Sequence, residues 1–121
     1  MIYQRDTLSN VICNIRIPSE RGEEVGTAIF IRRNNEPYLL TASHVIKNIN
    51  AQTYVVLSDA NGTPTIVMLN ILLGGSTFTN HHQADLAKAK IVITQANAQY
   101  LQERCFPFDQ IESISLADIE H

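Results

Sequence analysis

The sequence predicts an all-β domain in the form of a six-stranded antiparallel β-barrel, and three observations support this class. Short segments rich in Val, Ile, Tyr and Thr recur along the 121 residues, with turn signals between them. No segment keeps a helical period for more than about two turns. Because closure removes the free sheet edges that promote aggregation, short antiparallel strands with little helix favour a small barrel.

The six strands are expected at residues 11–17, 25–33, 37–42, 53–58, 65–73 and 86–93. Asn34-Asn35 lies between the second and third segments, and Asn suits a tight hairpin there because it tolerates positive φ. Asn61-Gly62 lies between the fourth and fifth segments and is the strongest short hairpin signal. Both turns therefore predict antiparallel neighbours.

The last strand is expected to turn one face toward water, because Lys88 and Lys90 alternate with apolar residues. These apolar residues are Ala87, Ala89, Ile91 and Ile93. Little helix is expected elsewhere. One helical turn should follow Ala42, and a second short helix is predicted within residues 94–104.

The composition fits one soluble globular domain over residues 1–121. A net charge of −3 gives no electrostatic reason to expect a nucleic-acid partner. The first twenty residues lack the apolar segment of a signal peptide, and no run reaches the roughly 20 apolar residues that cross a bilayer. The chain as written is therefore expected in the cytoplasm, with no membrane partner.

The two cysteines, Cys13 and Cys105, lie far apart and belong to no C-x-x-C motif. This spacing indicates neither a disulfide framework nor a zinc site. Both are expected to be reduced thiols that pack as small apolar groups.

One histidine follows directly on a strand-forming run. Residues 38–41 have the pattern of a buried strand, the small residues Ala42 and Ser43 precede His44, and residues 45–48 are compatible with a helix. An imidazole at such a junction is either packed or functional.

Three motifs together resemble the first barrel of the trypsin-like serine peptidases, namely GTAIFI at 26–31, YLLTASHVI at 38–46 and ADLAKAKI at 84–91. The resemblance implies that residues 8–93 form the N-terminal barrel of such an enzyme. It also implies that His44 is the general base and Asp85 its orienting carboxylate, roles taken from the family's own catalytic triad. The two residues are 41 positions apart, which is typical of the compact bacterial members.

These residue types belong together chemically. A serine hydroxyl is a weak nucleophile until a positioned base accepts its proton, and imidazole has an unperturbed pKa near neutrality. A carboxylate on the other ring nitrogen holds the required tautomer and stabilises the imidazolium that forms.

Family members also have a second barrel, which supplies the serine in a Gly-x-Ser-Gly/Ala-Gly loop, the oxyanion hole and the specificity pocket. No glycine follows Gly75, and Ser113 and Ser115 lack this context, so neither is expected to be the nucleophile. The chain is therefore expected to be the N-terminal half of the enzyme and inactive alone. Residues 94–121 would form a tail or linker toward the second barrel.

The function that the resemblance implies is peptide-bond hydrolysis without a cofactor. The expected partners are a peptide or protein substrate and the second barrel, with self-association where that barrel's docking face is left uncovered. Two features depart from the family pattern. Lys88 replaces the usual apolar residue, and the chain has no Ile-Val-Gly-Gly start, which fits a bacterial-type enzyme made without a zymogen step.

Two other functions remain open. A non-catalytic β-barrel interaction module, derived from a peptidase, would bind a peptide or protein along an exposed strand. A small metal-dependent hydrolase would use His44 with His81 and His82, but adjacent residues of an extended chain point to opposite sides, and no Cys or Glu stands at ligand spacing. We therefore predict no metal site and interpret residues 74–84 as a flexible, solvated loop.

Overall fold

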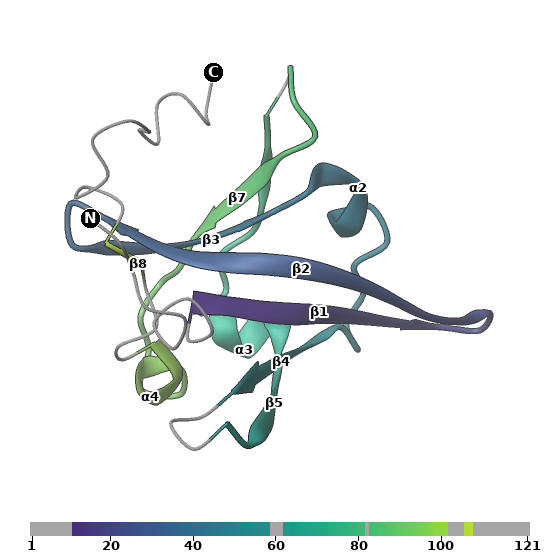
Figure 1. Ribbon diagram of the computed structural model, residues 1–121, viewed down its shortest axis with the longest axis horizontal. Helices are drawn as coiled ribbons and strands as arrows, with labels where there is room; N and C mark the ends of the chain where they lie inside the picture. The colour runs from purple at the N-terminus through teal and green to yellow at the C-terminus, as the bar shows by residue number, and fades with distance from the viewer. Residues whose placement is uncertain (1–10, 59–61, 82, 102–105, 108–121) are drawn as a thin grey trace.

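A computed structural model describes residues 11–58, 62–81, 83–101 and 106–107, and these form a mostly β domain with a few short helices (Figure 1). The strands lie in one sheet of order β5-β4-β1-β2-β3-β7-β6, antiparallel along this path, with β8 pairing parallel to β2. They are β1 (Ile12–Ser19), β2 (Gly22–Arg33), β3 (Glu36–Thr41), β4 (Tyr54–Ser58), β5 (Pro64–Met68), β6 (Thr79–Asn80), β7 (Ala87–Lys90) and β8 (Phe106–Pro107). The helices are α2 (Ser43–Ile46), α3 (Leu69–Leu73) and α4 (Ala98–Leu101).

The sheet has a buried inner face because its strands alternate with a period of two. In β1, Cys13, Ile15 and Ile17 are buried, whereas Ile12 is exposed. Phe30 and Leu39 continue the buried face on β2 and β3 and are fully buried. Among the described residues, none of the helices is long and apolar enough to span a bilayer.

The predicted all-β class is confirmed, and so is the hairpin at Asn34-Asn35. Both asparagines have positive φ, 53° and 64°, and β2 and β3 pair antiparallel on either side of them. The strands β4 and β5 are also antiparallel, although Asn61 of the predicted second hairpin lies outside the described residues. The helical turn expected after Ala42 is α2, and α4 lies within the range predicted for the second helix.

The prediction of one long strand over residues 65–73 is wrong, because β5 ends at Met68 and α3 follows at once. The buried residues Leu69, Leu72 and Leu73 recur at helical spacing instead of alternating, so a helix buries them all on one side. Gly74 ends the helix in the left-handed conformation, with a φ of 69°.

The strand predicted over residues 86–93 is shorter than expected. Ala87, Ala89 and Ile91 are buried as predicted, but β7 ends at Lys90 and the side chain of Ile93 is exposed. The preceding segment is also more regular than a flexible loop, because Thr79–Asn80 forms β6 and pairs antiparallel with β7. The backbone N–H of His81 donates to the carbonyl oxygen of Leu86, which extends this hairpin.

The sheet is open along its path, with β5 and β6 at its two ends, and no ladder joins these ends among the described residues. A set of hydrogen bonds nevertheless holds α3 against the segment that follows β7. The N–H of Val92 donates to the carbonyl oxygen of Leu73 at 3.1 Å. The side-chain amide of Asn97, which is fully buried, donates to the carbonyl oxygens of Leu72 and Val92, both at 2.9 Å.

We predict that Asn97→Ala lowers the free energy of unfolding by about 3 kcal/mol, because the carbonyl groups of Leu72 and Val92 stay buried after losing their donor. The measurement is equilibrium urea unfolding. Gln99→Ala, on the exposed side of α4, is the control and should change the free energy by no more than about 0.5 kcal/mol. Equal effects of the two substitutions would contradict the role given to Asn97.

Candidate active site

The end of β3 and the start of α2 are held by packing that leaves His44 on the surface. The hydroxyl of Thr41 donates to the carbonyl oxygen of Thr27 at 2.8 Å, which ties the last residue of β3 to β2. Val45 is the buried residue of α2 and packs over Gly26, where a Cβ atom would lie only 2.7 Å from Cγ1 of Val45. Any side chain at Gly26 would therefore force Val45 to shift.

The pairing of β3 with β7 brings Asp85 to the same place. Thr41 is the register partner of Ala87, so the residues just after β3 and those just before β7 lie at one edge of the sheet. A tight turn precedes β7, in which the N–H of Leu86 donates to the carbonyl oxygen of Ala84 at 2.8 Å. This turn presents Asp85 to α2.

The structure brings His44 and Asp85 together through both oxygens of the carboxylate. Nδ1 of His44 lies 2.5 Å from Oδ2 of Asp85, and the backbone N–H of His44 donates to Oδ1 at 2.8 Å. The two contacts fix the carboxylate relative to both the ring and the backbone that carries it. The side chains remain 68% and 56% exposed, so solvent reaches the pair.

The pKa of the Asp85 carboxyl is lowered, mainly by the hydrogen bond from the His44 side chain and next by the one from the His44 backbone. The carboxylate is therefore ionised at neutral pH. Since its pKa is lower in the folded chain than in the unfolded chain, the contact stabilises the fold above the unfolded pKa. This contribution is lost as the pH falls through the folded pKa, and the exposure of the pair keeps it small.

This geometry suits acid–base chemistry at the histidine. Because Nδ1 faces a carboxylate, the neutral ring carries its proton on Nδ1. The lone pair of Nε2 can then accept a proton. The pair borders a hollow of about 340 Å³, lined by Ser43, His44, Lys47, Asn80, His81, Ala84 and Asp85. A substrate group could reach the ring from this hollow.

Two polar residues of the hollow, Lys47 and Asn80, were not singled out by the sequence, and His81 entered only as a ligand of the metal-dependent alternative. Lys47 lies three positions after His44, and that helical spacing could have indicated it. Asn80 and His81 reach the hollow because β6 pairs with β7, and no local sequence signal indicated this pairing. The Nδ1 atom of His81 accepts a hydrogen bond from the backbone N–H of Gln83 at 3.0 Å, which orders the turn.

The other residues considered in the sequence analysis are either buried or outside the described residues. Cys13 is buried in the core, as expected for a small apolar group, whereas Cys105, Ser113 and Ser115 lie outside the described residues. Within the part of the chain that the structure describes, no group of three His, Cys, Asp or Glu residues is placed to hold a metal ion. His82 lies outside that part.

Comparison with known protein families finds no model that matches this chain, and comparison with curated proteins finds no match either. The function must therefore be inferred from the geometry of His44 and Asp85 and from the motifs that carry them.

We predict that His44→Ala raises the pKa of Asp85 toward its ordinary value of 3.8, because the hydrogen bond from the ring is the largest cause of the lowered pKa. The pH dependence of the Asp85 carboxyl ¹³C resonance measures this. Asn80→Ala removes a neutral residue of the same hollow and serves as the control. An Asp85 titration that is unchanged in His44→Ala would contradict the contact.

Proposed function

We propose that this chain is the N-terminal half of a trypsin-like serine endopeptidase, in which His44 is the general base and Asp85 orients it. One observation carries the proposal. Asp85 accepts hydrogen bonds from both the ring and the backbone of His44, although the two residues are 41 positions apart. A surface histidine and a surface aspartate have no structural need for such a two-point contact, because an exposed pair adds little stability.

In the proposed reaction, Nε2 of His44 accepts the proton of a serine hydroxyl as the serine oxygen attacks the carbonyl carbon of a peptide bond. His44 then donates this proton to the leaving amine, and the acyl-enzyme forms. A water molecule repeats the sequence and releases the acid. Asp85 stays ionised throughout and stabilises the imidazolium, which its lowered pKa supports.

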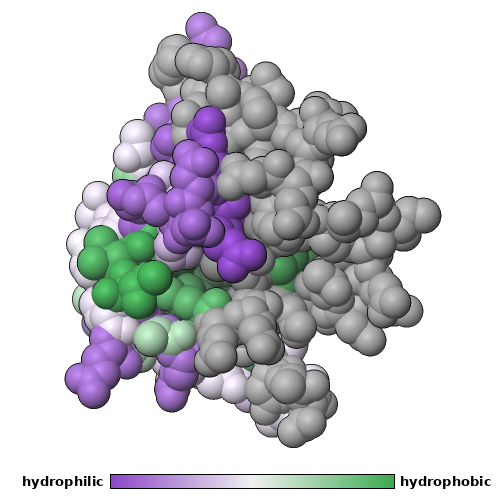
Figure 2. All heavy atoms as spheres, turned by 90° about the vertical axis from the view of Figure 1, so that its left-hand side faces the viewer, coloured by the Kyte–Doolittle hydropathy of each residue, from purple (hydrophilic) through white to green (hydrophobic). Residues whose placement is uncertain are grey.

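The serine and the oxyanion hole would come from a second barrel encoded beyond these residues. The 121-residue sequence has no Gly-x-Ser-Gly/Ala-Gly loop, so this chain alone lacks a nucleophile of the proposed kind. Exposed apolar side chains, among them Val92 and Ile93 in the segment after β7, are consistent with a docking partner. On the side of the molecule that carries α4 and the turn between β2 and β3, apolar side chains gather next to polar ones (Figure 2).

We also propose that the sheet corresponds to the six-stranded first barrel of this family, with its seam between β5 and β7. The strand order β5-β4-β1-β2-β3-β7 supports this correspondence. The hydrogen bond between Val92 and Leu73 is consistent with it, because it links the segment after β7 to the helix that follows β5.

A non-catalytic interaction module is the second candidate function. Ile66 on β5, at one end of the sheet path, is 65% exposed, and an exposed apolar end strand favours the addition of a partner strand. This function needs neither a serine nor an intact contact between His44 and Asp85. The two candidates therefore differ in their response to substitution at His44.

We predict that the full-length gene product reacts covalently with a fluorophosphonate probe and that His44→Ala slows the labelling by about 10⁴-fold or more, because the serine hydroxyl loses the base that accepts its proton. The rate of labelling at neutral pH is the measurement. Asn80→Ala, which alters the same hollow without removing a hydrogen bond to His44 or Asp85, is the matched control.

Labelling that is equally fast in His44→Ala and in the unsubstituted protein would refute the catalytic role of His44. A full-length product without any labelling, but with a partner that binds through β5 and is lost in Ile66→Asp, would favour the interaction module instead.

A further inference from the structure

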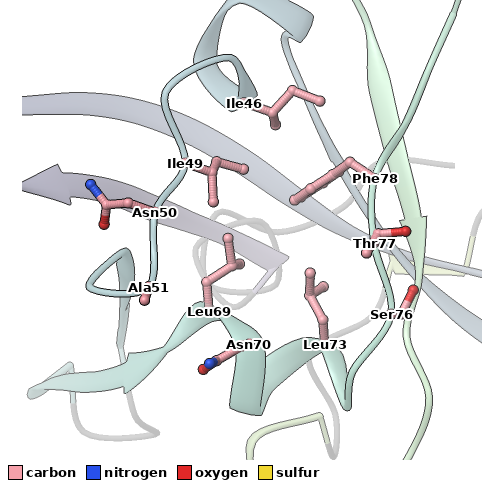
Figure 3. A pocket seen from close by; sticks show the side chains of 10 residues that line it. All are labelled: Ile46, Ile49, Asn50, Ala51, Leu69, Asn70, Leu73, Ser76, Thr77 and Phe78. Atoms are coloured by element: carbon pink, nitrogen blue, oxygen red, sulfur yellow. The ribbon is translucent and has the colours of Figure 1, made fainter.

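An apolar pocket of about 320 Å³ lies between the end of α2, the loop that follows it, and α3. Figure 3 shows the side chains of Ile46, Ile49, Leu69, Leu73 and Phe78 converging on its centre from three separate segments. None of its lining residues lines the hollow at His44 and Asp85. The pocket is therefore a separate feature, and its role is independent of the proposed peptidase function.

The pocket exists because the sheet is open at this place. The chain turns into α3 after Met68, so the opposite segment of Ser76, Thr77 and Phe78 has no strand beside it to pair with. The space between them is bordered by side chains instead of being filled by a ladder.

The walls are held apart by the core behind them. Leu69 and Leu73 are 4% and 3% exposed and belong to the hydrophobic core, while Ile49 and Phe78 are partly buried against it. Since these residues are anchored on the core side, collapse of the pocket would cost core contacts. The pocket is thus preformed, as small-molecule sites usually are.

The residues that line the pocket disfavour a charged ligand. Among the residues that the structure describes, no Asp, Glu, Lys, Arg or His lines the pocket. Its polar residues are Asn50, Asn70, Ser76 and Thr77. The amide of Asn50 is already used, since it donates to the carbonyl oxygen of Pro18 and accepts from the N–H of Gln52. Asn70 is exposed, and its side chain points away from the centre on which the apolar side chains converge (Figure 3).

We propose that this pocket is a binding site for a neutral, mainly apolar small molecule with one hydrogen-bonding group, such as a substituted phenol. The volume fits this class, because a cavity of about 150 Å³ holds one benzene ring and ligand pockets begin at roughly 300 Å³. The apolar floor would take the ring, and the hydroxyl group would lie at the open, polar margin of the pocket.

The test uses p-cresol as the probe and methyl NMR of the 121-residue chain as the readout. Titration should shift the methyl resonances of Ile46, Ile49, Leu69 and Leu73 in a saturable manner, with a dissociation constant in about the millimolar range or below. The anionic isostere p-toluate should bind at least about 10-fold more weakly, because the pocket has no cation to pair with its carboxylate.

Ala51→Trp should fill the pocket from its exposed margin and weaken p-cresol binding at least about 10-fold. Ala96→Trp introduces the same side chain at an exposed position outside the pocket and should leave binding unchanged. If Ala51→Trp does not fold, Thr77→Trp fills the pocket from the opposite side.

Three results would each overturn the proposal. The first is the absence of saturable shifts in the unsubstituted chain. The second is p-cresol binding that both filling variants leave intact, or that p-toluate matches. The third is a set of shifts at exposed residues such as Ile66 and Val92 in place of the pocket, which would indicate non-specific adsorption to apolar surface.

Discussion

The pairing of β3 with β7 is the constraint on which the candidate site depends. Its register sets Thr41 opposite Ala87, and from there His44 and Asp85 need only a short helix and a tight turn to meet. The two site residues are 41 positions apart, so the contact is available only to the folded chain. The small space over Gly26 completes the arrangement, because it lets Val45 pack inward and leaves the ring of His44 outward.

The open end of the sheet, by contrast, is not held by strand pairing. Where β5 turns into α3, side chains and single hydrogen bonds replace a ladder, and Asn97 donates to the carbonyl groups of Leu72, near the end of α3, and of Val92. This buried amide ties α3 to the segment after β7 at one end of the open region. At the other end the same gap leaves the apolar pocket between Leu69 and Phe78. One change in local structure thus accounts for both features.

Local sequence patterns predicted most of the β-structure. A run of strand-forming residues indicated β1, and the Asn34-Asn35 pair indicated the turn with positive φ between β2 and β3. They failed at residues 69–73, where an apolar run satisfies both a strand and a helix and only the spacing of the leucines separates the two. His44 and Asp85 could be singled out because their motifs resemble those of a known family. The positions of Asn80 and His81 beside this pair could not be predicted, because both reach the hollow through a two-residue strand pairing that depends on tertiary structure.

The most direct test of the proposed site is which ring nitrogen of His44 carries the proton when the imidazole is neutral. At a pH where the ring is neutral, ¹⁵N-labelled protein should give a far-downfield proton resonance coupled to Nδ1 of His44, with Nε2 unprotonated, because the Asp85 carboxylate accepts from Nδ1. This resonance should disappear in Asp85→Asn and persist in Asn80→Ala. A neutral ring with its proton on Nε2, or a downfield resonance that survives in Asp85→Asn, would contradict the assignment of His44 as a base oriented by Asp85.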